Sequence, residues 1–218
     1  MIDFSNLFSI ENLTRILIYG VVLMTAFPFH EFAHAFVANK LGDMTGRYQG
    51  RLSLNPLRHI DPFGTVCMLL TGFGWGKPVP VNTYNFKNKR LGFALVAAAG
   101  PVSNIILAFF FLLLFKILAF FGLVEAGWMY LVFNLLIFVN LRLAVFNLIP
   151  VPPLDGSRIA AYFIKSDIWG IIEQYQTFVF IGLILIMNTG VLQVPLEFLS
   201  NLLYNLIDLL SGLNWYLL

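Results

Sequence analysis

The stretch Phe29-His30-Glu31-Phe32-Ala33-His34 places three ionisable side chains inside an apolar run that spans residues 16–38. Residues four positions apart share one face of a helix, so His30 and His34 could hold a metal ion between their imidazoles, with Glu31 beside it. Ionisable side chains inside a membrane helix are costly unless they serve a function. The pattern therefore predicts metal binding. The alternative is a pair of buried histidines hydrogen-bonded to neighbouring helices.

The composition is that of a polytopic membrane protein. Hydrophobic residues make up 59% of the 218 residues and charged residues only 11%, with a mean hydropathy of +0.84. A soluble domain carries about twice that charged fraction. The net charge of +2 is too small to suggest nucleic acid as a partner. Cys67 is the only cysteine, which excludes an internal disulfide and a cysteine-based metal site.

Five apolar runs qualify, or nearly qualify, as membrane spans, which need about 20 residues of helix. They cover residues 13–38, 91–121, 128–149, 178–194 and 196–210. Residues 1–11 lack the basic region of a secretory signal, so we expect the first run to remain as a helix. We predict an all-α polytopic membrane protein with about five transmembrane helices.

A short region between the first and second spans is expected to be different. Residues 63–73 are apolar but too few to cross the bilayer, so they are expected to be re-entrant or interfacial. Residues 75–82 contain two prolines, which would confine an extended segment to the edge of a sheet. We therefore add a short re-entrant or β-strand region to the predicted fold.

Charge places the loop between the first two spans in the cytoplasm. Residues 40–90 carry eight lysines and arginines against two aspartates, and the positive-inside rule assigns such a loop to the cytoplasmic side. Pro28 should bend the first helix or free the carbonyl of Met24, with the metal site near one membrane face. The first helix would then deliver His34, and the third Asp155, to the same side.

Two histidines leave a zinc ion incompletely ligated, because a catalytic zinc usually has three protein ligands. Asp155 is the best candidate for the third. The proline-rich segment 147–156 cannot continue as a regular helix, so Asp155 should lie on non-helical backbone. Its alternative role is an Asx turn before Gly156. Glu31 is the candidate general base, and its alternative is a carboxylate paired with an arginine.

Asn147 lies one turn before this break. Its amide could donate a hydrogen bond to a carbonyl oxygen that becomes negative in a transition state. The alternative is a hydrogen bond between helices. Arg142, inside the third predicted span, should pair with an acid or face a wet cavity.

Four motifs together resemble the site-2 protease family of intramembrane zinc metalloproteases, in its short bacterial form without a PDZ or CBS domain. They are His30-Glu31-xx-His34, Asn55-Pro56-xx-His59-Ile60-Asp61-Pro62-xx-Gly64, Gly100-Pro101-xx-Asn104 and Asn147-xx-Pro150-x-Pro152-Pro153-Leu154-Asp155-Gly156.

The resemblance implies that His30, His34 and Asp155 bind one zinc ion per chain and that Glu31 activates a water molecule. It also implies that Asn147 lies in the catalytic centre, and that residues 75–82 belong to a strand region that pairs with an unwound substrate.

His59 and Asn104 are expected to belong to the site as residues that position the substrate or the ligands. The place of His59 in its motif favours a hydrogen-bonding partner of the site or a residue of the water path, rather than a polar residue at the membrane boundary. Gly100, Pro101 and Asn104 are expected to provide close helix packing and a bend near the site, with no direct catalytic role.

We expect a single membrane-embedded domain over residues 1–218, with a catalytic core at about 13–158 and two further helices at about 174–215. It would cleave peptide bonds in or beside transmembrane segments of other membrane proteins in regulated intramembrane proteolysis. The expected location is the bacterial cytoplasmic membrane, with the active site near the cytoplasmic face. The alternatives are a catalytically inactive membrane adaptor, which an intact Glu31 argues against, and a metal or ion transporter, which would spread its ligands along a path.

Overall fold

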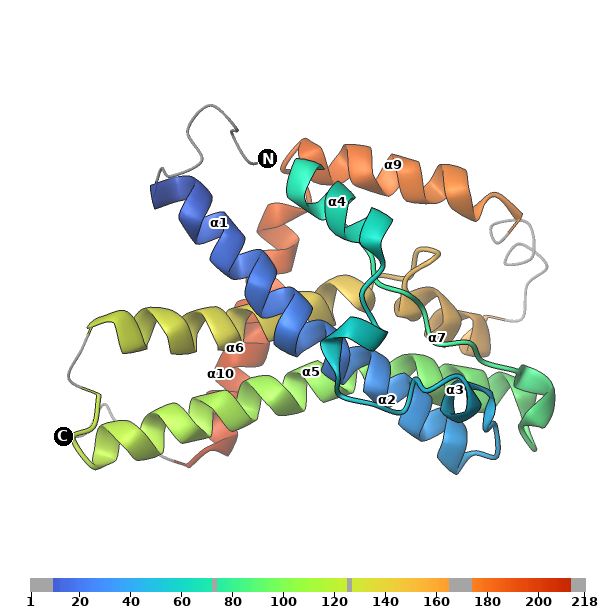
Figure 1. Ribbon diagram of the computed structural model, residues 1–218, viewed down its shortest axis with the longest axis horizontal. Helices are drawn as coiled ribbons and strands as arrows, with labels where there is room; N and C mark the ends of the chain where they lie inside the picture. Colours follow the sequence, from blue (N-terminus) through green and yellow to red (C-terminus); the bar gives the residue numbers. More distant parts are fainter. Residues whose placement is uncertain (1–9, 72–73, 125–126, 165–173, 213–218) are drawn as a thin grey trace.

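The computed structural model describes residues 10–71, 74–124, 127–164 and 174–212 (Figure 1). Across these residues the fold is all-helical, as predicted, and three helices are long and apolar enough to cross a membrane. The predicted β-strand is not formed there. Residues 74–82 are non-helical, and a single isolated antiparallel bridge joins Gly76 to Ile60. Two prolines in this segment limit the ladder hydrogen bonds that it could donate.

The first long helix is continuous but irregular. It consists of α1 (Ile10–Val21), a π-helical turn η2 (Val22–Ala26) and α2 (Phe27–Lys40). The N–H of Phe27 donates to the carbonyl of Val22, five residues back, which widens this turn. Pro28 is the second residue of α2. The irregularity predicted at Pro28 is thus present, immediately before it.

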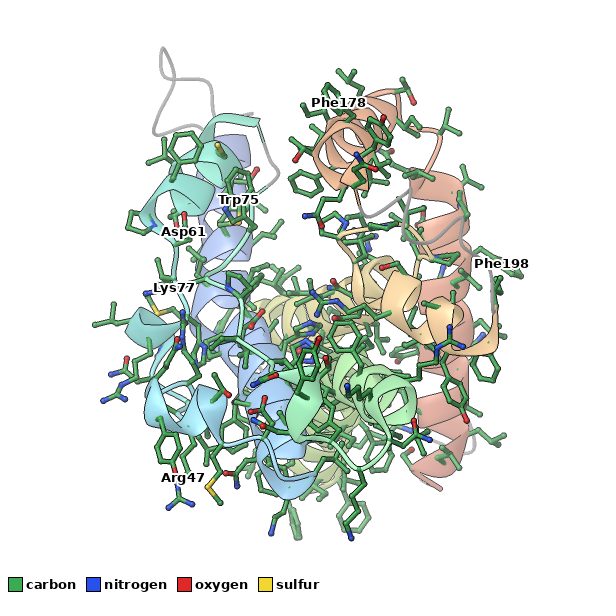
Figure 2. All side chains as sticks on the ribbon, turned by 90° about the vertical axis from the view of Figure 1, so that its right-hand side faces the viewer. Arg47, Asp61, Trp75, Lys77, Phe178 and Phe198 are labelled. Atoms are coloured by element: carbon green, nitrogen blue, oxygen red, sulfur yellow. The ribbon has the colours of Figure 1, made fainter. Side chains whose placement is uncertain are left out.

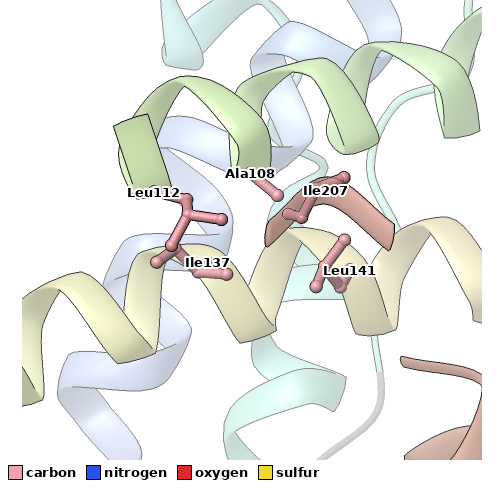
Figure 3. Packing of buried hydrophobic residues seen from close by; sticks show 5 residues of the cluster. All are labelled: Ala108, Leu112, Ile137, Leu141 and Ile207. Carbon is pink, nitrogen blue, oxygen red and sulfur yellow. The ribbon is translucent and has the colours of Figure 1, made fainter. Parts of the chain in front are cut away.

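Helix α5 (Lys89–Phe120) is the central element, because it packs against α2, α6 (Gly127–Asn147), α7 (Asp155–Phe163) and α10 (Gln193–Leu210). Its first turn is capped by the Asn88 side chain, which accepts a hydrogen bond from the N–H of Leu91. Figure 3 shows the buried cluster that joins three of these helices: Ala108 and Leu112 of α5, Ile137 and Leu141 of α6, and Ile207 of α10.

The segment between α6 and α7 corrects one prediction. Leu154 is extended, as expected, but Asp155 is the first residue of α7, so it lies on helical backbone. Helix α7 continues to Phe163, and residues 165–173 lie outside the described residues. A short helix forms here because residues 155–163 follow the last proline and contain strong helix formers.

Two helices occupy the positions of the fourth and fifth predicted spans. Helix α9 (Gln176–Asn188) has 13 residues, about 20 Å of helix, and is too short to cross a bilayer core alone. Helix α10 packs on α5 and α6, and Asp208 in its last turn pairs with the buried Lys116 of α5 at 2.6 Å. The five-span count stays a prediction.

The loop from α2 to α5 contains four short helices, α3 (Thr45–Tyr48), η3 (Pro56–Arg58), α4 (Pro62–Thr71) and η4 (Thr83–Asn85). Buried Asp43 ties it together, accepting hydrogen bonds from the N–H of Thr45 at 3.1 Å, the N–H of Asn82 at 2.7 Å and the amide of Asn85 at 2.8 Å. Burial alone would raise the pKa of Asp43, but these bonds lower it below its ordinary value. Asp43 therefore fixes the end of segment 74–82.

Candidate metal centre

Helix α2 buries its two histidines directly against the backbone of α5. Gly100 makes this approach feasible, since a Cβ atom there would lie 2.5 Å from Cε1 and Nε2 of His30 and 2.6 Å from Cε1 of His34. The rings are nearly perpendicular, with centroids 4.6 Å apart. The Gly100 motif predicted close helix packing near the site, and the structure shows that the packing partners are the two imidazoles themselves.

Both imidazoles are oriented through Nδ1. Nδ1 of His34 lies 2.7 Å from the backbone carbonyl oxygen of Val96, and Nδ1 of His30 lies 2.7 Å from Oδ1 of Asn104. A carbonyl oxygen only accepts hydrogen bonds, so each Nδ1 carries a proton and Nε2 is the ring nitrogen left to bind a metal. Metal-binding histidines usually have an outer partner of this kind. The structure thus brings Asn104, a tentative candidate, into direct contact with His30.

Asp155 completes the group. Its Oδ2 lies 3.0 Å from Nε2 of His30 and 3.3 Å from Nε2 of His34, although 125 residues separate Asp155 from His30 in the sequence. Two ligands of a tetrahedral zinc ion at about 2.0–2.1 Å lie about 3.3–3.4 Å apart. Two imidazoles and one carboxylate at this spacing fit zinc, and the structure brings the three predicted ligands together.

The position of Asp155 depends on the glycine that follows it. A Cβ on Gly156 would lie 2.2 Å from the carbonyl oxygen of Leu148, so only glycine lets the start of α7 fold back on the end of α6. This close approach brings the proline-rich segment back toward α2.

Glu31 lies beside these ligands. One of its carboxylate oxygens is within 4.8 Å of a ring nitrogen of each histidine, and Oε2 accepts a hydrogen bond from the N–H of Val79 at 3.2 Å. Distance alone would allow either acid to be the third ligand. Oδ2 of Asp155 lies 3.0 and 3.3 Å from the two Nε2 atoms, whereas the carboxylate of Glu31 is held by the N–H of Val79.

A cavity of about 400 Å³ contains these groups. Trp75 and Phe180 of α9 contribute to its wall, and their ring centroids are 6.0 Å apart. Figure 2 shows Trp75 and helix α9, which carries Phe178, on opposite sides of the upper part of the molecule. A larger cavity of about 550 Å³ is lined by α2 and α5 residues, but none of them is ionisable, so it cannot supply acid–base or metal chemistry.

Asn147 is the last residue of α6 and lines the same cavity. Its amide donates to the carbonyl oxygen of Leu143 at 2.9 Å, within its own helix. The hydrogen bond from Asn147 to another helix, which was the alternative to a catalytic role, is not the one observed. An asparagine amide has two N–H groups, so a second donor remains available for a substrate carbonyl.

Two other sequence-based expectations have a different outcome. His59 is buried but does not line the cavity; its Nε2 lies 2.6 Å from the carbonyl oxygen of Ser53, and its own carbonyl accepts the N–H of Lys77 at 2.8 Å. It therefore anchors segment 74–82, and no contact with the metal ligands is found among the described residues. Arg142 is exposed, and the described part of the chain gives it no acidic partner, so the expected ion pair is not found and a wet cavity around Arg142 stays a prediction.

Val96 and Val79 were not foreseen. Each acts through a backbone group, the carbonyl of Val96 on His34 and the N–H of Val79 on Glu31. Every non-proline residue has these groups, so the side chains at these positions gave no signal.

Comparison with known proteins points to the same class of protein as this site, a zinc metalloprotease. A sequence model described as "Peptidase family M50" matches residues 116–188. The chain is 45% identical over 179 residues to "Putative zinc metalloprotease YwhC" of Bacillus subtilis, covering 78% of this chain and 79% of that protein. It is 36% identical over 134 residues to "Putative zinc metalloprotease Rip2" of Mycobacterium tuberculosis, of which it covers 49%. Identity to "Putative zinc metalloprotease MJ0611" of Methanocaldococcus jannaschii is 29%, over 76% of this chain and 81% of that protein. No solved structure gave a significant match.

Proposed function

Because this chain belongs to the site-2 protease family, peptidase family M50, we propose that it is an intramembrane zinc metalloendopeptidase that cleaves peptide bonds in or beside transmembrane segments of other membrane proteins. Membership of a family of membrane metalloproteases, together with three long apolar helices, makes the chain a membrane protein. The cleavage of membrane-embedded substrates, and a role in regulated intramembrane proteolysis, are the steps that we add.

One observation carries the proposal. Nε2 of His30, Nε2 of His34 and Oδ2 of Asp155 converge at 3.0 and 3.3 Å in a cavity that also contains Glu31. One zinc ion held by these three ligands would polarise the scissile carbonyl and make water a better nucleophile. Glu31 takes the proton from the attacking water and passes it to the leaving amine. The free amide N–H of Asn147 stabilises the carbonyl oxygen as it becomes negative.

The substrate is a transmembrane segment that has unwound locally, because a helix engages its carbonyls in its own hydrogen bonds. Residues 74–82 support this choice, since they are non-helical and Val79 places them directly beside Glu31. Backbone groups of this segment that have no partner in a sheet can pair with an extended substrate.

We also propose the arrangement in the membrane. Eight basic residues between positions 40 and 90 favour the cytoplasmic side for this loop, in a bacterial plasma membrane, and the metal centre lies near the same face. In this proposal residues 1–218 form one domain, in which α9 and α10 are embedded in the membrane beside the three long helices, although α9 alone is too short to cross the bilayer core. The packing of α10 on α5 and α6 supports its place in the bundle.

The first test measures zinc per chain in the purified protein and needs no substrate. Wild type and Glu31→Gln are expected to carry about one zinc ion, whereas His30→Ala and Asp155→Ala lose most of it. Retention of full zinc by Asp155→Ala would show that the third ligand is wrong. No zinc in wild type kept away from chelators would remove the metalloprotease mechanism.

The second test separates a protease from an adaptor or a transporter. Wild type, Glu31→Gln and the control Glu197→Gln, an exposed acid on α10, are reconstituted in liposomes with a panel of single-span membrane proteins. Wild type and the control should release the same fragments, and Glu31→Gln should release none. Equal cleavage by Glu31→Gln would exclude Glu31 as the base.

A further inference from the structure

Two buried asparagines connect the metal centre to the third long helix. Asn104 of α5 and Asn140 of α6 are both 0% exposed. The amide nitrogen of Asn104 donates to Oδ1 of Asn140 at 2.9 Å and to the carbonyl oxygen of Ala26 at 3.0 Å. The amide nitrogen of Asn140 donates to the carbonyl oxygen of Leu136 at 2.8 Å. With the bond from His30, this forms a continuous polar chain across α2, α5 and α6.

The backbone carbonyls of Leu136 and Ala26 decide which group donates in each hydrogen bond of this series. The backbone carbonyl of Leu136 can only accept, so Asn140 must point its NH₂ group at it and present Oδ1 to Asn104. Asn104 must then direct its own NH₂ group toward Asn140 and the carbonyl of Ala26, which leaves Oδ1 facing His30. An oxygen in that position requires the proton on Nδ1 of His30.

We propose that Asn140 is a positioning residue for the zinc ligand His30, acting through Asn104. It keeps the Asn104 amide from flipping, and thereby keeps Nδ1 of His30 protonated and Nε2 free for the metal. The inference deepens the proposed function, because it rests on the assignment of His30 as a zinc ligand. It assigns no contact with substrate or metal to Asn140.

We call the series Asn140–Asn104–His30 the relay. Only His30 needs it, because the two histidines differ in the group that contacts Nδ1. The outer partner of His34 is the backbone carbonyl of Val96, which cannot exchange a donor for an acceptor. The outer partner of His30 is an amide side chain, whose flipped state would present NH₂ to Nδ1 and move the proton to Nε2. Asn140 and the Ala26 carbonyl oppose that state by placing two acceptors at the other end of Asn104.

The test is the zinc dissociation constant of the purified protein, measured by competition with a chelator. Asn140→Leu is compared with Asn134→Leu, a matched control on the same helix, where the exposed Asn134 also donates to a carbonyl four residues back, that of Tyr130, at 2.9 Å. Loss of an outer partner typically weakens metal binding by about 10–100-fold. Because Ala26 still holds Asn104, we expect about tenfold weaker binding for Asn140→Leu and no change for Asn134→Leu.

A conservative variant distinguishes the relay from simple packing. Asn140→Asp still presents an oxygen to Asn104, whether or not the acid is protonated, so its zinc affinity should stay within about threefold of wild type. In a protein that already carries Asn104→Ala, adding Asn140→Leu should not lower zinc affinity further, since Asn140 can no longer act on His30 through Asn104. Should Asn140→Leu fail to fold, Asn140→Ala removes the same bond without added bulk and carries the same expectation.

Two results would overturn the relay. One is equal zinc affinity of Asn140→Leu and wild type, and the other is an equal loss in Asn140→Asp and Asn140→Leu. Failure of the wild type to bind zinc would instead refute the ligand set itself, so the two failures are distinguishable.

Discussion

Replacement of Gly100 by alanine should disable the metal centre by displacing both imidazoles at once. The added Cβ would lie 2.5 Å from two ring atoms of His30 and 2.6 Å from Cε1 of His34. Carbon atoms in contact prefer about 3.5–4.0 Å, so the rings or the whole of α2 must move by about 1 Å. Neither ring can move freely, because Asn104 and the Val96 carbonyl each hold one Nδ1 at 2.7 Å.

The size of the effect follows from what that displacement does to ligation. Metal–ligand distances tolerate about 0.2 Å, so a shift of about 1 Å breaks the ligand geometry. We expect zinc affinity to fall by at least about 100-fold, and overpacking to lower the free energy of unfolding by about 1–3 kcal/mol. The matched control is Gly182→Ala on α9, where a Cβ meets no atom within 4 Å and helix propensity should improve.

The assay is chelator competition for zinc, together with thermal unfolding of the metal-free protein in detergent. Gly182→Ala should bind zinc like wild type. Wild-type zinc affinity in a folded Gly100→Ala protein would refute the argument, because it would mean that the imidazoles do not ligate from the positions against α5.

Three further predictions concern the contact that holds Glu31, the loop from α2 to α5, and the ion pair between α5 and α10. Val79→Pro removes the N–H that holds Glu31 but adds little bulk between Pro78 and Pro80, so kcat in the liposome assay should fall about tenfold while zinc per chain stays unchanged. Asp43→Ala leaves the N–H of Asn82 without its acceptor and should destabilise the protein by about 1–3 kcal/mol at neutral pH. Because the pKa of Asp43 is lowered in the folded protein, this stability is present above the ordinary pKa of aspartate and is lost as the pH falls through the folded value, so melting curves of wild type and variant should converge in acid. Lys116→Met deprives Asp208 of its 2.6 Å ion pair and should lower the melting temperature, yet leave zinc affinity unchanged, because Lys116 lies about 24 Å along α5 from Gly100.

The ionisable side chains that lie in apolar surroundings could be predicted as members of the site from the sequence. His30, His34 and Asp155, which lie together in the structure, were predicted as ligands because an ionisable group at membrane depth is costly unless it serves a function. The same reasoning fails for backbone groups, which explains why Val96 and Val79 were missed. His59 was assigned to the site because of its place in the Asn55–Gly64 motif, whereas its ring contacts the carbonyl of Ser53 and supports the loop.

Helix boundaries were harder to predict than helix existence. The prolines at positions 150, 152 and 153 correctly indicated a break after α6, but no residue pattern showed whether the next helix begins at Asp155 or later. The strand prediction at residues 75–82 failed for a related reason. An extended segment becomes a strand only when a partner pairs with it, and Ile60 provides a single bridge.

The metal centre and the cavity wall depend on different parts of the fold. The ligands come from α2 and α7, both of which pack on α5, so their mutual geometry is set by close contacts such as those of Gly100 and Gly156. The wall formed by Trp75 and Phe180 comes instead from a non-helical segment and from α9, which packs more sparsely on the long helices. Metal binding needs fixed ligands, whereas the proposed membrane substrate would need a path into the cavity. A shift of α9 would therefore break fewer packing contacts than a shift of α2 or α7, whose contacts with α5 hold His30, His34 and Asp155 in place.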